Sequence, residues 1–211
     1  MIDLVLLGGG GHAKSILDCL YRNNQTALKN QTIVITDPDL KEGSLVLNSK
    51  VYGSDDSLPE IYANGCRNAF ISVGSIKTTN LRRKLSNYAE TCGFNLIKVI
   101  DPSAVISDFS QIYEGVFVGK QAVINADSII KKNSIINSKV LIEHECYIGE
   151  YTHIACGSIL CGNVSVGNDT FVGAGTTVIE GVKIGDNVVI GAGSTILRDI
   201  NDNEKVFGVV K

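Results

Sequence analysis

The residues best suited to chemistry lie close together in the stretch IEHECYIGEYTHIACGSILCGN, residues 142–163. The chain has three histidines, and two of them, His144 and His153, fall in this stretch. An imidazole can take up a proton near neutral pH, and a carboxylate beside it can fix its tautomer and favour the imidazolium that forms. Glu143 and Glu145 flank His144, so the sequence favours a general base at this position.

The carboxylate partner of His144 depends on the local backbone. On an ideal strand, neighbouring side chains point to opposite faces. Glu145 therefore reaches His144 only if the chain bends there, and either Glu145 or Glu143 could supply the partner.

Three other interpretations of the same stretch remain open. A zinc site needs three or four ligands, and His144 with His153 supplies only two, so we expect no metal. Cys146 lies two residues from His144 and could be a nucleophile if a basic neighbour activated its thiol. The non-catalytic alternative is a surface histidine between solvated carboxylates.

The elements that must position these residues follow a six-residue period. Ile, Val or Leu occupies every sixth position from residue 106 to residue 196, sixteen positions in succession. A helix would show a period of 3.6 and a strand a period of 2, whereas a strict period of six is typical of a parallel β-helix of hexapeptide repeats. Each hexad supplies one short strand and a turn, and three hexads close a coil. The glycines that follow the aliphatic residue are expected where the chain turns a corner with an unusual backbone angle.

The repeat predicts which residues stack on one another. Three hexads make a coil of 18 residues, so residues 18 apart lie at the same place on adjacent coils. Gly162 follows His144 by that spacing and should lie one coil along on the same edge. His153 lies half a coil away, nearer the face of a neighbouring subunit if the site is formed between subunits.

The first hundred residues follow a different pattern. Strand-like runs at residues 3–7, 32–36, 69–73 and 95–100 alternate with helix-like segments at residues 12–23 and 78–93. This alternation predicts a small parallel sheet with helices packed on it.

A glycine-rich loop joins the first strand to the first helix. In the sequence LLGGGGHAKS, Gly8, Gly10 and Ala13 match the pattern G-x-G-x-x-A between a strand and a helix, the context that a dinucleotide fingerprint requires. Glycines let the backbone approach a diphosphate, and the N-terminus of a helix offers free amides and a positive dipole end. We expect a nucleotide held by its diphosphate, because half of a doubly wound sheet can bind a mononucleotide. NAD, or a turn that serves only packing, is the alternative.

Three polar side chains could complete this nucleotide site. Asp37 closes the second strand, where a carboxylate can hydrogen-bond a ribose or a base. His12 and Lys14 project from the first helical turn, close to a bound phosphate or sugar.

The composition of the chain limits the kinds of partner and compartment to be expected. The chain of 211 residues has a formal net charge of −3, which gives no reason to expect nucleic acid or an anionic membrane surface. No run approaches the roughly 18 apolar residues of a membrane span, so no membrane insertion is expected. The six cysteines form no C-x-x-C pair, and the N-terminus has no basic region or cleavage-like site. We therefore expect reduced thiols and a cytoplasmic protein.

Three motifs together resemble one family. GGGGHAK, DPSA at residues 101–104 and IEHECYIGEYTHIACGSILCGNVSVG are similar to the sugar acetyltransferases of the UDP-N-acetylbacillosamine N-acetyltransferase and sialic acid O-acetyltransferase group. The resemblance covers nearly the whole chain. It implies an α/β nucleotide-sugar domain (a half-Rossmann sheet) over residues 1–100, a left-handed parallel β-helix over residues 101–211, and a homotrimer.

The resemblance also implies roles for individual residues. His144 would be the general base, assisted by Glu145, and the backbone amide of Gly162 would stabilise the oxyanion on the thioester carbon. His153 would contact the thioester end of acetyl-CoA, and Asn137 would position the sugar.

The remaining implied contacts bind the two substrates. Ala174 and Ala192 would lie along the pantetheine arm of acetyl-CoA. The nucleotide-sugar would be held by residues of the glycine loop and the second strand, namely Gly8, Gly10, Gly11, His12, Lys14 and Asp37. One departure is the C-terminal sequence VFGVVK, which has Val210 where relatives have a proline.

The resemblance thus implies a direct transfer of acetyl from acetyl-CoA to the 4-amino group of a UDP- or dTDP-linked 4-amino-4,6-dideoxy sugar, for polysaccharide biosynthesis. O-acetylation of a sialic acid is the enzymatic alternative. A non-catalytic nucleotide-sugar-binding protein and a structural solenoid are the alternatives of another class.

Overall fold

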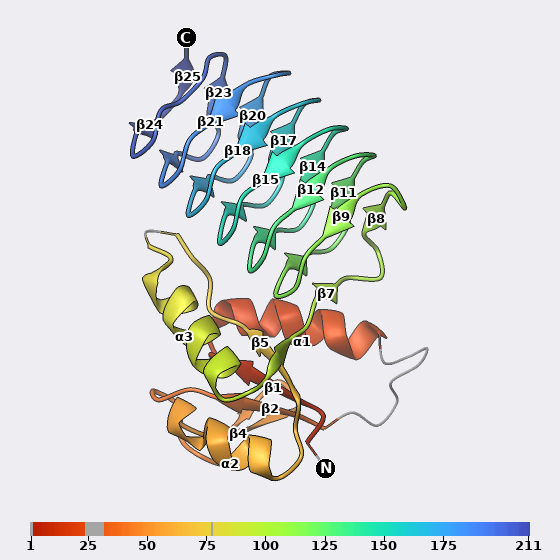
Figure 1. Cartoon of the computed structure of the whole chain (residues 1–211), viewed down its shortest axis with the longest axis vertical. Helices are drawn as coiled ribbons and strands as arrows, with labels where there is room; N and C mark the ends of the chain where they lie inside the picture. The colour runs from red at the N-terminus through yellow and green to blue at the C-terminus, as the bar shows by residue number, and fades with distance from the viewer. Residues whose placement is uncertain (1, 24–31, 77) are drawn as a thin grey trace. The chain divides into compact units, whose positions relative to one another are not determined.

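The computed structural model describes residues 2–23, 32–76 and 78–211. The chain forms two compact units (Figure 1). The first comprises residues 1–74 and 80–99, and the second comprises residues 75–79 and 100–211. The short segment 75–79 therefore packs with the second unit although it is followed by a helix of the first.

The first unit is built around a six-stranded sheet in the order β3-β4-β2-β1-β5-β6. Its strands are β1 (Leu4–Leu7), β2 (Ile33–Thr36), β3 (Leu45–Val46), β4 (Ser49–Gly53), β5 (Asn68–Ile71) and β6 (Asn95–Leu96). All neighbouring strands are parallel except β3 and β4, which form an antiparallel hairpin. Its helices are α1 (Gly11–Asn23), a 3-10 turn (Asp55–Ser57), α2 (Leu58–Ala63) and α3 (Asn80–Thr91).

The central strands show why this sheet forms. β1 reads LVLL, and every residue in it is buried, as is every residue of β2. Parallel strands covered on both faces read as continuous apolar runs of this kind. The predicted α/β unit is confirmed, but the sequence analysis missed helix α2 and the β3–β4 hairpin. It also read residues 95–100 as one strand, whereas only Asn95–Leu96 pairs with β5.

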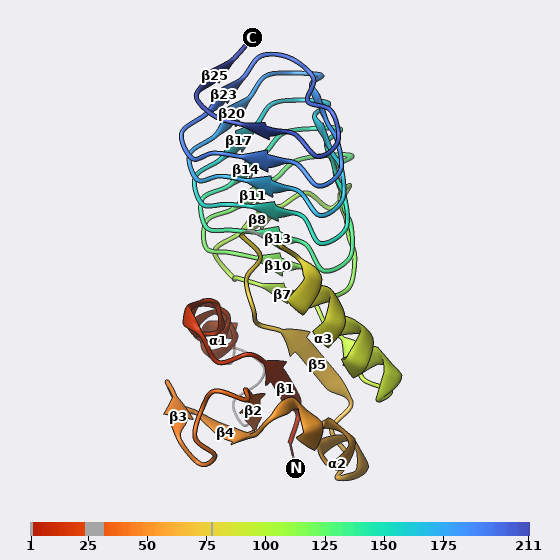
Figure 2. The ribbon, with the colours of Figure 1, turned by 90° about the vertical axis from the view of Figure 1, so that its left-hand side faces the viewer.

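The second unit is a solenoid of three parallel sheets (Figures 1 and 2). One sheet holds β7 (Val99–Ile100), β10 (Phe117–Val118), β13 (Ile135–Ile136), β16 (His153–Ile154), β19 (Phe171–Val172), β22 (Val189–Ile190) and β24 (Lys205–Val206). A second holds β8 (Val105–Ile106), β11 (Val123–Ile124), β14 (Leu141–Ile142), β17 (Ile159–Leu160), β20 (Thr177–Val178), β23 (Thr195–Ile196) and β25 (Val209–Val210). The third holds β9 (Gln111–Ile112), β12 (Ile129–Ile130), β15 (Tyr147–Ile148), β18 (Ser165–Val166) and β21 (Lys183–Ile184).

The repeat sets the register of these sheets. Ile124 pairs with Ile142, and Ile142 with Leu160, so each strand lies beside the strand 18 residues on. The second residue of nearly every strand points inward and is buried in one continuous aliphatic core. Since burying such a side chain stabilises the fold by about 1.5–3 kcal/mol, stacked aliphatics hold the coils together. The hexapeptide β-helix is thus confirmed.

The expectation that glycine takes the unusual backbone angle holds at Gly115, Gly157 and Gly175 (φ 67–71°), but not at the glycines directly after the aliphatic residue. The unusual backbone angle occurs two residues later in the hexad, as at Asn133 (φ 59°) and Lys139 (φ 60°). The glycines that follow the aliphatic residue are needed for close packing instead. A Cβ at Gly149 would lie 2.6 Å from the backbone carbonyl carbon of Gly167 in the next coil.

A row of Ser and Thr side chains, here called the inner ladder, also joins the coils from inside. At the position two residues before the inward aliphatic, a Ser or Thr hydroxyl donates a hydrogen bond to the carbonyl oxygen 15 residues on. The bonds run from Ser128 to Glu143, Ser134 to Gly149, Thr152 to Gly167, Ser158 to Gly173, Thr170 to Gly185 and Thr176 to Gly191, at 2.6–3.2 Å. Valine takes the same position at residues 140, 164, 182 and 188, so the coil also accepts an apolar side chain there.

The spacing shortens at the C-terminal end of the solenoid. Val206 pairs with Ile190 and Val210 with Ile196, at separations smaller than a full coil. Val210 is 8% exposed, so its side chain lies at the C-terminal end of the aliphatic core.

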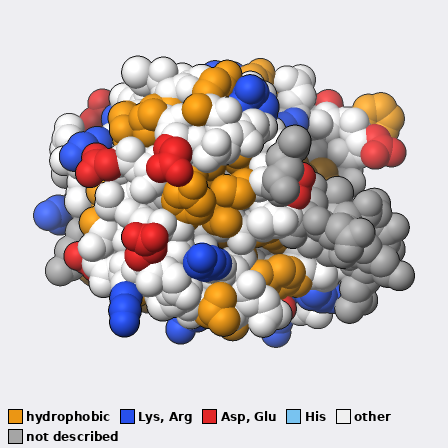
Figure 3. Space-filling view, turned by 90° about the horizontal axis from the view of Figure 1, so that it is seen from below, with side chains coloured by type: hydrophobic (Ala, Val, Ile, Leu, Met, Phe, Trp, Pro, Cys, Tyr) orange, Lys and Arg blue, Asp and Glu red, His pale blue; other side chains and the backbone are white. Residues whose placement is uncertain are grey.

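Within the described ranges, no helix is both long and apolar enough to cross a membrane. On the face drawn in Figure 3, the described acidic and basic side chains lie dispersed among backbone, polar and apolar side chains.

Candidate active site

His144 and Glu145 lie at a corner of the solenoid and are in direct contact. The Nδ1 atom of His144 is 3.0 Å from Oε2 of Glu145. Glu145 has a φ of 59°, so the chain bends at this residue and its side chain turns toward the imidazole, as the sequence analysis required. With Nδ1–H donating to the carboxylate, the neutral ring carries its lone pair on Nε2. His144 is 55% exposed, so Nε2 is open to a substrate.

Gly162 lies against the ring of His144, one coil along as predicted. A Cβ at Gly162 would be 2.5 Å from Cε1 and 2.7 Å from Nε2 of His144. The coils are also joined here by the amide of Asn163, which donates to the carbonyl oxygen of His144 at 2.8 Å. Only a residue without a side chain therefore lets the imidazole take this position.

The amide of Gly162 donates no hydrogen bond to any described residue. Equivalent amides on another edge of the solenoid are bonded. Glu150 N–H donates to Asn168 at 2.8 Å, and Asn168 N–H donates to Asp186 at 2.6 Å. The amides of Ala126, His144 and Glu180 in the same column likewise donate to no described residue, so what distinguishes the Gly162 amide is its place beside the ring of His144.

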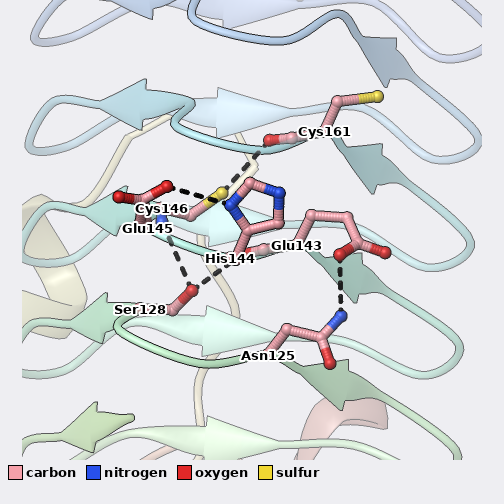
Figure 4. A network of polar contacts seen from close by, with 7 residues as sticks. All are labelled: Asn125, Ser128, Glu143, His144, Glu145, Cys146 and Cys161. Atoms are coloured by element: carbon pink, nitrogen blue, oxygen red, sulfur yellow. Dashed lines mark hydrogen bonds and ion pairs between the residues drawn. The ribbon is translucent and has the colours of Figure 1, made fainter. Parts of the chain in front are cut away.

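A polar network beneath the corner holds this loop in place (Figure 4). The Ser128 hydroxyl donates to the carbonyl oxygen of Glu143 at 2.8 Å and accepts the amide of Cys146 at 3.3 Å. It therefore ties together the residues on either side of His144 and Glu145. Asn125 donates to Oε2 of Glu143 at 2.9 Å, so Glu143 is engaged away from His144.

The structure disfavours Cys146 as a nucleophile. Its side chain is 1% exposed, and its thiol donates to the carbonyl oxygen of Cys161 at 3.2 Å. Burial raises the pKa of the Cys146 thiol to about 11. Since the thiolate is the reactive form, this thiol is inert at neutral pH.

His153 and Asn137 are brought together on a different part of the solenoid. His153 lies on β16, is 7% exposed, and has Nδ1 2.8 Å from the carbonyl oxygen of Ser75. Because that oxygen can only accept, Nδ1 carries the proton, and Nε2 is left to accept the Asn137 amide at 3.4 Å. Phe171 packs edge-on against the ring, so the orientation of His153 is determined by three neighbours.

Ala174 and Ala192 lie on one edge, a full coil apart. The amide of Gly193 donates to the carbonyl oxygen of Ala174 at 2.8 Å. Ala174 is half-buried and Ala192 is exposed, so this edge presents small side chains and backbone.

The first unit contains a cavity of about 320 Å³ beside the glycine loop. Five predicted residues line it, Gly8, Gly10, Gly11, His12 and Asp37. A Cβ at Gly10 or Gly11 would meet nothing within 4 Å, so the backbone at the start of α1 is open to the cavity. Lys14 is exposed on the same helix and does not line the cavity.

Asp37 also supports the loop itself. Its Oδ2 accepts the amide of Gly9 at 2.7 Å and its Oδ1 accepts the amide of Asp39 at 2.9 Å. Charge-assisted bonds of this kind are strong, so Asp37 holds the glycine loop against the end of β2.

The sequence analysis missed Asp55, Asp39, Leu81 and Leu85, which also line the cavity. Asp55 accepts a hydrogen bond from the Thr36 hydroxyl at 2.6 Å. Burial raises the pKa of Asp55, and the nearby carboxylates of Asp37 and Asp56 raise it further. The glycine loop and Asp37 already indicated a site at this edge of the sheet, and the polar Thr36 at the end of the apolar strand IVIT was one further signal.

No group of three or more metal-ligating side chains occurs among the described residues.

Comparisons with known proteins match both units of the structure. Residues 3–89 match the PglD N-terminal domain, and residues 163–198 match the bacterial transferase hexapeptide family. PerB from Caulobacter crescentus, solved with CoA and GDP-perosamine, is 36% identical over 98% of this chain and 94% of its own, with a TM-score of 0.89. The chain belongs to the hexapeptide-repeat sugar N-acetyltransferases.

Other members and relatives share this architecture. The acetyltransferase domain of PglB from Neisseria gonorrhoeae FA1090, solved with acetyl coenzyme A, is 30% identical over 98% of this chain and 96% of its own, with a TM-score of 0.85. WeeI from Acinetobacter baumannii AYE is 17% identical over 99% of this chain and 97% of its own, and its TM-score of 0.66 shows the common fold.

Proposed function

We propose that this sugar N-acetyltransferase transfers acetyl from acetyl-CoA to the 4-amino group of a nucleotide-linked 4-amino-4,6-dideoxy sugar. The observation that carries the proposal is the pairing of His144 and Gly162. It places an imidazole nitrogen, oriented by Glu145, beside a backbone amide that makes no bond to a described residue. A base next to an oxyanion donor is the arrangement that acyl transfer requires.

The proposed reaction is direct. Nε2 of His144 accepts a proton from the attacking amine as its nitrogen bonds to the thioester carbon. The amide of Gly162 stabilises the negative charge on the carbonyl oxygen, and Glu145 stabilises the imidazolium. When the C–S bond breaks, the imidazolium returns the proton to the sulfur of CoA. No acyl-enzyme forms, since the one cysteine next to His144 is a buried thiol.

The cavity of the first unit is the proposed nucleotide site. The diphosphate would lie at the glycine loop and the N-terminus of α1, where the partial positive charge of a helix favours anions. The carboxylates of Asp39 and Asp55 would repel phosphate and instead accept N–H groups of a base or hydroxyls of a ribose. The resemblance implies UDP or dTDP, and the relative PerB was solved with GDP-perosamine, so all three nucleotides belong in the test.

The proposed assembly is a homotrimer. The sheet of β8, β17 and β25 presents apolar side chains outward, with Val105 64%, Ile159 39% and Val209 64% exposed. Covering such a face on a neighbouring copy would remove apolar surface from water. Light scattering should give the mass of three chains of 22.5 kDa, and a monomer mass would contradict the assembly.

The proposal is tested by thiol release from acetyl-CoA with UDP-, dTDP- and GDP-linked 4-amino-4,6-dideoxy sugars and free sialic acid. Turnover with a nucleotide-linked amino sugar supports it. Turnover with sialic acid alone would establish the O-acetyltransferase alternative, and no turnover would favour the non-catalytic alternatives. His144→Ala should lower kcat by about 10²–10⁴-fold and leave nucleotide-sugar binding intact. An unchanged kcat would remove the base assignment.

A further inference from the structure

Cys146 occupies an unusual place in the inner ladder of the solenoid. At the position two residues before the inward aliphatic, the residues from 128 to 194 are serine, threonine or valine, with Cys146 as the one exception. Its thiol makes the same bond as the hydroxyls, to the carbonyl oxygen 15 residues on. The substitution of sulfur for oxygen thus occurs next to His144 and one coil below Gly162.

The acceptor of this bond belongs to a particular peptide group. Cys146 donates to the carbonyl oxygen of Cys161, and the next amide along the chain is that of Gly162. The structure has no cis peptide among the described residues, so the carbonyl and the amide of this group point in opposite directions. Figure 4 shows the carbonyl of Cys161 bonded to the buried thiol, so the Gly162 amide of the same trans peptide points the opposite way, out from the core.

We propose that Cys146 is a positioning residue that aims the Gly162 amide at the reacting carbonyl by holding the Cys161–Gly162 peptide from behind. The inference rests on the proposed acetyl transfer. A donor on the carbonyl side restricts rotation of the peptide plane and also polarises its N–H, because hydrogen-bonded groups strengthen one another in a low-dielectric interior. The amide of Gly162 is thereby oriented before substrate arrives, which is what gives an oxyanion donor its effect.

The solenoid contains a matched control for this bond. Thr152 donates to the carbonyl oxygen of Gly167 at 2.6 Å, one ladder position along. The amide that follows, that of Asn168, is bonded to Asp186 at 2.6 Å and cannot serve a substrate. Thr152→Val removes the same kind of bond from a peptide without a proposed chemical role, together with the bond that the hydroxyl accepts from the amide of Thr170 at 3.2 Å.

The test compares three variants in the thiol-release assay. Cys146→Val removes the donor and introduces a slightly larger side chain that the coil accepts at four equivalent positions. It should lower kcat about tenfold, a part of the 10²–10³ lost with a whole oxyanion donor, and leave KM for acetyl-CoA unchanged. Cys146→Ser restores a donor and should retain wild-type kcat. Thr152→Val should reduce Tm and leave kcat within about twofold of wild type.

Two results would overturn the inference: wild-type kcat in Cys146→Val, or an equal loss of kcat in Thr152→Val. A measurement without turnover separates this inference from the proposed function. In protein labelled with ¹⁵N-glycine, the Gly162 amide resonance should shift in Cys146→Val and not in Thr152→Val. If wild-type protein acetylates no acceptor while this shift is seen, the proposed function fails and the peptide contact stands. If Cys146→Val does not fold, Cys146→Ala takes its place in both measurements.

Discussion

The substitution Gly162→Ala should displace the imidazole of His144 without destabilising the fold. The new methyl group would lie 2.5 Å from Cε1 and 2.7 Å from Nε2 of His144. Carbon atoms in contact are normally about 3.5 Å apart or more, so the ring must move by roughly 1 Å. A displacement of that size at a reacting group can cost about 10²-fold in rate, and we expect kcat to fall by about that factor.

The same substitution should have little effect on folding. The backbone of Gly162 is outside the left-handed region, so alanine adopts it without strain. Its neighbours in the same column, Ala126 and Glu180, already carry side chains. The group that must move is the half-exposed imidazole rather than backbone, so Tm should stay within roughly 2 °C of wild type. In contrast, Gly149→Ala pushes against backbone of the next coil and should reduce Tm.

Steady-state kinetics and thermal unfolding of four proteins complete the test: wild type, Gly162→Ala, His144→Ala and the double variant. If the methyl group acts through the base, it costs almost nothing once His144 is gone, since coupled residues are not additive. Wild-type kcat in Gly162→Ala would refute the placement of the ring. So would a full 10²-fold additional loss in the double variant, because the effect would then not depend on His144.

Two further predictions follow from the buried groups. Burial raises the pKa of Asp55, so the folded protein binds the proton of this carboxyl more tightly than the unfolded chain does. The protonated carboxyl therefore stabilises the fold below about pH 4, and this contribution is lost as the pH rises through the pKa of Asp55 in the folded protein. Asp55→Asn should therefore raise Tm by roughly 1–3 °C at pH 7 and by less at pH 4, and an equal shift at both values would contradict the assignment. Iodoacetamide at pH 8 should modify the exposed Cys156 and spare Cys146, whose pKa is raised to about 11; peptide mass spectrometry would show the reverse if Cys146 were the nucleophile.

The solenoid was predictable because each hexad repeats the same local solution. The six-residue period alone placed Gly162 above His144, since stacking follows from counting residues. The sequence analysis could say only that Glu145 would reach His144 if the chain bent there, because a glutamate in the sequence does not indicate a positive φ. In the first unit, Asp55 could not be found, since its place in the cavity comes from tertiary packing and not from a motif. The second role of Asp37, which holds the glycine loop, arises for the same reason.

The 18-residue register also limits which changes in chain length this protein can tolerate. Inserting or deleting a whole coil away from residues 144–162 would lengthen or shorten the column and leave the base beside its glycine. A six-residue insertion between them would preserve the buried aliphatics, and the protein would still fold. It would nevertheless carry Gly162 around to the next edge of the triangle, away from His144. Length variation in hexads is thus neutral for the core and disabling for the site, whereas variation in whole coils outside that interval spares both.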